Sequence, residues 1–226
     1  MDERSNIITI DGPGGAGKSS LAKRLAQSLG WVDLDTGAIY RAVALALFNK
    51  GVLNPTAELA GQMAQTLNLK FQRTGGTLRL FLDDQELGES LREPAISKLA
   101  SVVSAFKETR QALLPLQRSL GQKGELVAEG RDMGTVIFPE AKLKFFLEAA
   151  VEIRAERRFW ELKAQGKGTP LSEVLADLQT RDRSDESRSL APLVKTPESV
   201  VINASHLGLE EVFQFARAKA QEVFGL

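Results

Sequence analysis

A glycine-rich run near the N-terminus constrains this chain of 226 residues more than any other feature. Residues 12–19 read Gly-Pro-Gly-Gly-Ala-Gly-Lys-Ser, the pattern of a phosphate-binding loop. An apolar β-branched run, Ile7–Ile10, precedes the loop. A helical pattern follows, with leucines at every fourth position up to Leu29, and Gly30 is suited to end it. This strand–loop–helix context predicts a true phosphate loop rather than a glycine-rich turn with an exposed lysine.

The loop carries its own chemistry. Successive backbone N–H groups form a nest for phosphate oxygens, and the helix N-terminus adds partial positive charge. Lys18 is expected to reach the β- and γ-phosphates, and the Ser19 hydroxyl is expected to take a Mg²⁺ coordination position. The residues predicted to bind the nucleoside triphosphate are Gly12, Pro13, Gly14, Gly15, Ala16, Gly17, Lys18, Ser19 and Ser20.

Composition excludes several other classes of protein. The formal net charge is zero, so no global charge favours nucleic acid or an anionic membrane as a partner. Cysteine is absent, which excludes disulfides and thiolate chemistry and fits a reducing compartment. The longest uncharged apolar stretch, Ala42–Phe48, is too short to span a membrane, and the polar segment Met1–Asn6 does not read as a signal peptide. With His206 as the one histidine, a histidine-based triad or zinc site is not expected. We therefore expect a cytoplasmic protein with small-molecule partners.

The alternation of apolar runs and helical patterns predicts the fold class. Five short, nearly continuous apolar runs read as buried parallel strands. Helical patterns fill most of the gaps, so we expect an α/β fold with an open parallel five-stranded sheet and helices on both faces. The predicted strands are Ile7–Ile10, Trp31–Leu34, Leu126–Ala128, Leu143–Leu147 and Val200–Ile202, and the predicted final helix covers Leu209–Phe224.

One stretch breaks this alternation. Residues Leu67–Leu87 alternate apolar and polar positions around Thr-Gly-Gly and Asp-Asp turns, which predicts a small antiparallel meander inserted between the second and third strands. The helices expected to flank it are Ala38–Lys50, Thr56–Leu67, Glu93–Phe106 and Glu108–Leu120.

A second inserted region, Val151–Leu190, is helical and rich in charge, with a break at Gly166–Pro170. Spacings of four residues predict surface ion pairs there, namely Arg157 with Glu161 and Asp177 with Arg181.

Two polar motifs follow the second and third strands. Ligands of open α/β sheets bind at the carboxyl ends of the strands, so both motifs should lie near the phosphate loop. In Asp33–Arg41, Thr36 has a part as a helix N-cap, and Arg41 is suited to grip a second phosphate as well as to form a surface ion pair. In Glu129–Thr135, an arginine suited to a transferring phosphoryl group precedes an aspartate suited to an exocyclic amino group. An ordinary turn with solvated charges is the alternative for this motif.

A third motif lies in the charged insertion. Arg181, Asp185 and Arg188 fall at positions i, i+4 and i+7, so they share one face of a helix. They form either an ion-pair ladder or a lid face that presents two cations and a ribose-binding carboxylate. Spacing does not decide between the two. Asn49-Lys50 is not followed by the aspartate of the base-reading motif of GTPases, which counts against a GTP-driven switch.

Taken in order, these motifs resemble those of the bacterial cytidylate kinases. The resemblance covers the phosphate loop, Asp35–Arg41, Glu129–Pro139, Arg181–Arg188 and the following Ser189–Leu193, and with the meander it extends over essentially the whole chain. Thr36 and Glu129 stand where serine and aspartate also occur in the family, and both keep the functional group.

The resemblance implies transfer of the ATP γ-phosphoryl group to CMP or dCMP, with Mg²⁺ as cofactor and the enzyme acting as a monomer. It implies a kinase core (residues 1–37, 121–150 and 191–226), an acceptor-binding insertion (38–120) and a lid (151–190). The choice among Asp33, Asp35 and Glu129 as the acid that orders Mg²⁺-bound water stays open.

The same resemblance implies roles for individual residues. Thr36, Arg41 and Arg131 would hold the acceptor phosphate. Ser101, Arg110 and Asp132 would read the cytosine edge. Arg181, Asp185 and Arg188 would approach the sugar and the phosphates from the lid. The residues implied to act in catalysis are Lys18, Arg131, Arg181 and Arg188.

Two other functions compete with this prediction. One is a kinase for another monophosphate, such as UMP or AMP. The other is a regulatory module that binds a nucleotide without acceptor chemistry.

Overall fold

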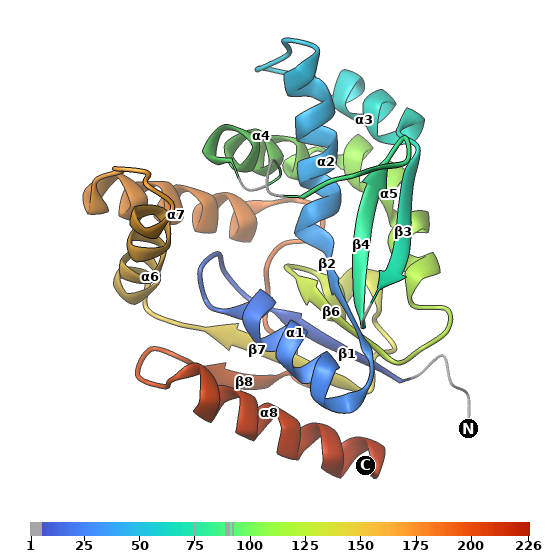
Figure 1. The fold of residues 1–226 in the computed structure, drawn as a ribbon, viewed down its shortest axis with the longest axis vertical. Helices are drawn as coiled ribbons and strands as arrows, with labels where there is room; N and C mark the ends of the chain where they lie inside the picture. Colours follow the sequence, from blue (N-terminus) through green and yellow to red (C-terminus); the bar gives the residue numbers. More distant parts are fainter. Residues whose placement is uncertain (1–5, 75, 89–90, 92) are drawn as a thin grey trace.

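The computed structural model describes residues 6–74, 76–88, 91 and 93–226 and is built around one mostly parallel sheet (Figure 1). The strand order is β3-β4-β2-β6-β1-β7-β8, and β5 pairs with β4 outside this path. Most of the polar N-terminal segment, and Gly75 in the first predicted meander turn, lie outside the described residues. The strands are β1 (Ile7–Asp11), β2 (Val32–Asp35), β3 (Leu69–Thr74), β4 (Thr77–Leu82), β5 (Gln85–Glu86), β6 (Leu126–Gly130), β7 (Leu143–Glu148) and β8 (Val200–Asn203).

The five predicted parallel strands are confirmed as β2, β6, β1, β7 and β8, with every neighbouring pair parallel. All residues of β1 and β6 are buried because helices cover both faces of the sheet, which explains their continuous apolar pattern. Trp31, predicted as the first residue of the second strand, is buried one position before β2 begins.

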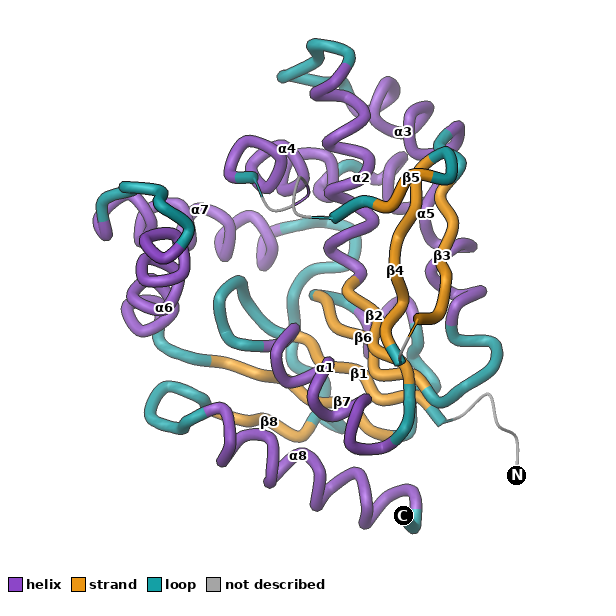
Figure 2. The backbone as a smooth tube through the Cα atoms, viewed as in Figure 1, coloured by secondary structure: helices purple, strands orange, loops and turns teal. Residues whose placement is uncertain are grey.

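Different helices cover the two faces (Figures 1 and 2). α1 (Lys18–Leu29) and α8 (Leu209–Phe224) pack on one face, where Leu21, Leu25 and Phe213 join the largest core cluster. The π-helical turn Met133–Ile137 lies on the other face, beside α5.

The antiparallel meander is confirmed, with β4 pairing with both β3 and β5. Asp83 and Asp84 both have positive φ (49° and 66°), as a two-residue hairpin turn requires. The meander does not stand apart from the core, because β4 also pairs in parallel with β2 through Asp33 and Thr77 and so extends the main sheet.

Four helices surround the meander within one or two residues of the predicted bounds. Their buried side chains, among them Val43, Ile96 and Leu113, form a second core cluster. The largest shift is at the start of α2, because the Asp35 side chain accepts from the Ala38 N–H and begins the helix earlier than expected. The helices are α2 (Thr36–Asn49), α3 (Ala57–Thr66), α4 (Pro94–Ala105) and α5 (Lys107–Leu120).

The charged insertion folds into α6 (Val151–Ala164) and α7 (Leu171–Ser187), with the break between them where it was predicted. The two helices share a small apolar cluster of their own and stand beyond the carboxyl ends of the strands (Figure 1). Across the described residues, no helix is both long enough and apolar enough to span a membrane.

One predicted ion pair on this insertion is wrong. Arg157 donates to the Ala204 carbonyl at the end of β8 (2.7 Å), and its neighbour Arg158 pairs with Glu161 instead. The spacing of four residues predicts that Arg157 and Glu161 share one face of the helix. Because the end of β8 lies against Arg157, that arginine binds the Ala204 carbonyl instead of Glu161.

Candidate active site

The phosphate loop occupies the turn between β1 and α1. Gly12 has a φ of 149°, and a β-carbon there would lie 2.0 Å from the Leu147 carbonyl oxygen, so only glycine fits. Gly17 is the left-handed N-cap of α1, with φ of 99°. The buried Lys18 ammonium donates to the Pro13 carbonyl (2.7 Å) and is thereby folded over the loop. The backbone donors, the helix N-terminus and this lysine together form an anion-binding cradle.

The Ser19 hydroxyl donates to Glu129 Oε1 (2.5 Å). Burial raises the pKa of Glu129, and the neighbouring Asp35 carboxylate raises it further. Of the three acids weighed from sequence, Asp35 is already engaged by the Ala38 N–H and by Arg41. A hydroxyl and a carboxylate side by side are hard oxygen donors of the kind Mg²⁺ prefers.

Thr36 and Arg41 lie at the carboxyl end of β2, as predicted. Thr36 is not the N-cap, because Asp35 takes that position. The buried Thr36 hydroxyl instead donates to the Glu129 carbonyl (2.8 Å), which ties α2 to the end of β6. Arg41 pairs with Asp35 (2.6 Å), and its side chain is 23% exposed. Arg41 therefore forms the ion pair that was the alternative prediction for it. The pair is partly buried at the carboxyl end of β2 and does not lie on the exposed surface.

Arg110 and Asp132 form a buried ion pair, with their side chains 6% and 3% exposed. The other Arg110 terminal nitrogen donates to the Ser104 carbonyl (3.1 Å), and the guanidinium lies 5.4 Å from the Tyr40 ring centroid. Ser101 lies one turn before Ser104 on α4 and is half-buried. Among the described contacts, its hydroxyl has no hydrogen bond to Arg110 or Asp132.

Asp185 joins the charged insertion to the loop after β6. It is buried, accepts from Arg131 Nε (2.7 Å) and pairs with Arg188 one turn further along α7. The ladder alternative is thus partly correct, since the Asp185–Arg188 pair exists on the helix. Arg131 also approaches the phosphate loop, because a β-carbon on Gly14 would lie 3.5 Å from its Nη2 atom. The face of α7 carrying these residues therefore points into the site.

Arg181 lies on the same helix and is half-buried. Within the described part of the chain, ion pairs engage Arg131 and Arg188 but none involves Arg181, so the predicted pair with Asp177 is wrong.

The electrostatics of the site show an excess of crowded cations. Burial and the Arg131 charge lower the pKa of Lys18 to about 7. Burial and the charges of Arg131 and Arg41 lower the pKa of Arg181 to about 10. Burial, Arg110 and Arg131 lower the pKa of Arg188 to about 10 as well. Burial is the largest cause of each shift and the positive neighbours add to it, a combination that favours anionic ligands at this place.

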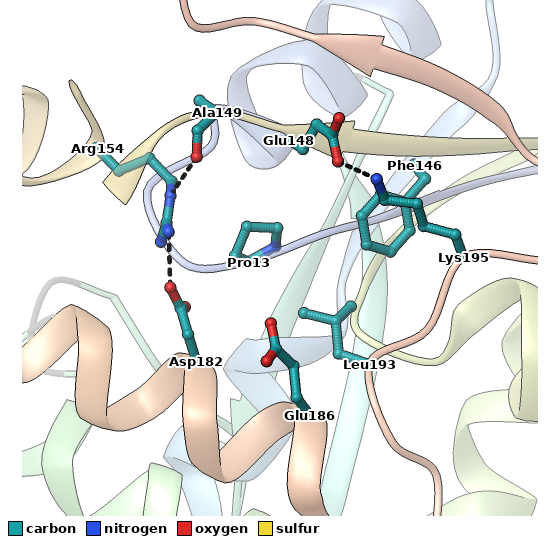
Figure 3. Close-up of a pocket in the computed structure, with 9 residues that line it drawn as sticks. All are labelled: Pro13, Phe146, Glu148, Ala149, Arg154, Asp182, Glu186, Leu193 and Lys195. Carbon is teal, nitrogen blue, oxygen red and sulfur yellow. Dashed lines mark hydrogen bonds and ion pairs between the residues drawn. The ribbon is translucent and has the colours of Figure 1, made fainter. Parts of the chain in front are cut away.

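Sequence reasoning gave no specific role to Arg154, which the structure places at a junction. It donates to the Ala149 carbonyl (2.8 Å), to the Gly14 carbonyl (3.0 Å) and to Asp182 on α7 (2.6 Å). The sequence signal that could have pointed to Arg154 is its position in the first turn of α6, the helix that follows β7. Figure 3 shows it on one side of a cavity of about 340 Å³ beside Pro13, with the Glu148–Lys195 pair on the other side.

Comparison with known proteins matches this arrangement to one family. A sequence model of the family described as cytidylate kinase matches residues 8–222. The chain belongs to the cytidylate kinase family. The cytidylate kinase of Citrifermentans bemidjiense is 42% identical over 220 residues, covering 97% of this chain and 94% of that protein. That of Geobacter sulfurreducens is 45% identical, covering 92% and 90%. That of a Yersinia pestis strain is 40% identical, covering 97% and 96%.

A solved structure supports the fold of this cytidylate kinase family member. A gluconokinase from Sinorhizobium meliloti superimposes with a TM-score of 0.50 and 15% identity, covering 96% of this chain and 93% of that one. At that identity the likeness concerns the fold alone. The α/β fold class predicted from the sequence is confirmed.

Proposed function

We propose that this member of the cytidylate kinase family transfers the γ-phosphoryl group of ATP to CMP or dCMP, giving ADP and the diphosphate. The observation that carries the proposal is the convergence of two polar regions on one edge of the sheet. Arg131 approaches Gly14 of the phosphate loop, while Thr36 is tied through the Glu129 carbonyl to the end of β6, the strand that Arg131 directly follows. A donor and an acceptor bound there would meet end to end.

The donor would bind on residues 12–20. The loop amides and the N-terminus of α1 would cradle its phosphates, and Lys18 would leave the Pro13 carbonyl for a phosphate oxygen. Ser19 and Glu129 are the residues that would hold Mg²⁺ and its water, because they lie in contact at the mouth of the loop. When bound, Mg²⁺ neutralises phosphate charge.

The acceptor would bind among the remaining motif residues. Arg41 and Arg131 would grip its phosphate in charge-assisted hydrogen bonds, beside Thr36. Asp132 would accept from the cytosine amino group while Arg110 stays paired with it, and Ser101 would add a contact from α4.

The helices α6 and α7 would act as the lid. Their separate apolar cluster fits a unit that moves against the core, and Arg181, Asp185 and Arg188 would line its inner face. Closure would bring cations to the transferring group and exclude the water that would otherwise hydrolyse ATP. Each arginine contact at the developing charge would contribute about 3 kcal/mol. No general base is needed because the acceptor phosphate is already anionic. We propose that the enzyme acts as a monomer.

A coupled assay of ADP release across the common ribo- and deoxynucleoside monophosphates tests this proposal. CMP and dCMP should give the highest kcat/KM. A preference for UMP or AMP would reassign the acceptor. Slow ATP hydrolysis unchanged by any monophosphate would indicate a regulatory module and reject the kinase function.

A further inference from the structure

Asp11, the last residue of β1, has no part in the chemistry proposed above. Its side chain is nonetheless buried and fully engaged. Oδ1 accepts from the Met133 N–H and Oδ2 from the Gly134 N–H, both at 2.8 Å. These donors directly follow Arg131 and Asp132 in the chain, so a residue of the donor strand holds the loop of the proposed acceptor site.

The two N–H groups need an outside acceptor. Met133 opens the π-helical turn Met133–Ile137, and the first N–H groups of a helical turn find no carbonyl within it. An aspartate at the preceding position normally accepts from the second or third of these N–H groups with its own side chain, which here would include the Gly134 N–H. Asp132 holds that position but makes no capping bond, because its carboxylate is paired with Arg110.

The turn is also pressed against β1. A β-carbon on Gly134 would lie 2.9 Å from the Thr9 hydroxyl oxygen and 3.1 Å from Lys144 Cδ. Because β1 and β6 pair in register, with Asp11 opposite Gly130, the Asp11 carboxylate lies directly beneath the turn. The turn is thus held to the neighbouring strand by tight packing and by two hydrogen bonds.

We propose that Asp11 is a positioning residue for acceptor recognition: it caps the turn from the neighbouring strand and so leaves the Asp132 carboxylate free to pair with Arg110 and face the acceptor base. Without Asp11, Asp132 would turn back to cap the Gly134 N–H itself. The role in base choice rests on the proposed function, whereas the capping exchange does not.

Asp11→Asn tests the kinetic part, since an amide nitrogen cannot accept the second N–H bond. We expect the preference for CMP over UMP, as a ratio of kcat/KM values, to fall about tenfold, the equivalent of one hydrogen bond. KM for CMP should rise while KM for ATP changes less than twofold. Asp84→Asn in the exposed β4–β5 turn is the control and should change neither. An unchanged CMP preference, or equal effects on both substrates, would overturn the proposal.

A double variant shows whether Asp11 acts through Asp132. If it does, Asp11→Asn combined with Asp132→Asn should discriminate CMP from UMP no worse than Asp132→Asn alone. Losses that multiply would mean that the two residues act independently, and the proposal would fail.

Two further measurements need no substrate, and the first of them needs no variant either. Amide hydrogen exchange on the unchanged protein should show Met133 and Gly134 strongly protected, and rapid exchange at both would refute the capping. A crystal structure of Asp11→Asn should show the Asp132 carboxylate at the Gly134 N–H, and Asp132 still paired with Arg110 would also refute the proposal. Since these readouts involve no nucleotide, a failure of the proposed function would leave them standing.

Discussion

The two halves of the proposed site are built in different ways. The donor half is one contiguous run, residues 12–20, whose working groups are mostly backbone N–H donors held by glycine conformations and a helix N-terminus. The acceptor half is made of side chains from β2, α2, α4, α5, the loop after β6 and α7. There, Arg41, Arg110, Arg131 and Arg188 already hold carboxylates.

This difference shows two ways of preparing a protein for an anion. The donor half leaves its main-chain donors and a weakly engaged lysine ready, so binding costs little rearrangement. The acceptor half keeps four of its arginines paired with aspartates, so an incoming phosphate must compete with existing partners. A phosphate carries more charge and more acceptor oxygens than a carboxylate, so it can displace an aspartate from an arginine. Specificity for the acceptor then depends on which of the arginine–aspartate pairs it displaces. If this contrast is correct, substitutions in the two halves should change different kinetic constants.

Lys18→Met should have the largest effect, because it removes the one side-chain cation of the donor half. We expect kcat to fall about a thousandfold, the scale of losing a charge-stabilising donor in the transition state. Thermal unfolding should change little. Steady-state kinetics measure the effect, and Lys23→Met, an exposed lysine on α1, is the matched control. Turnover near that of the control would reject the role of Lys18.

Asp11 joins the two halves, and its ionisation should be visible in stability. Burial raises the pKa of Asp11 from 3.8 to about 6. Between these values the folded protein keeps a proton that the unfolded chain releases, so the Asp11 contribution to stability falls as pH rises from 4 to 6. The total loss is about 3 kcal/mol.

Denaturant unfolding of the unchanged protein and of Asp11→Asn from pH 4 to 7 measures this effect. The difference in free energy of unfolding between them should shift in favour of Asp11→Asn with rising pH and level off above pH 6. A difference that stays constant across the range would contradict the raised pKa.

Arg41→Ala should affect the acceptor half alone. The loss of a charge-assisted phosphate contact should raise KM for CMP about fiftyfold and leave KM for ATP within twofold. Arg24→Ala, at a partly exposed arginine on α1, serves as the control. Equal increases in both KM values would show that the halves are not separable.

Asp132→Asn should give the smallest change, in base choice. Its amide keeps the volume and one acceptor of the carboxylate but loses the charge. We expect the preference for CMP over UMP to fall about tenfold with little change in kcat for CMP. An unchanged preference would show that Asp132 does not read the base.

The contrast between the halves also explains what the sequence could predict. The phosphate loop, the five parallel strands and the meander follow from local patterns, because glycine positions, apolar runs and turn residues act over short distances. The acid beside Ser19 stayed open from sequence, since Glu129 lies 110 positions away and meets it only across paired strands.

Ion-pair partners were the weakest predictions. Spacing shows that two helical residues share a face, but not which structure that face meets. Arg157 meets the end of β8, and Asp185 meets Arg131 across the site. The capping by Asp11 could not be predicted, because it requires the register of β1 on β6 and the knowledge that Asp132 is occupied elsewhere.

The most direct test of the account is a crystal structure of the protein with a non-hydrolysable ATP analogue and CMP bound together. We expect the triphosphate on residues 12–20 and the CMP phosphate within hydrogen-bond distance of Arg41 and Arg131, in line with the γ-phosphate. A CMP molecule bound away from Thr36, Arg41 and Arg131 would contradict the central claim that one cleft aligns the two nucleotides.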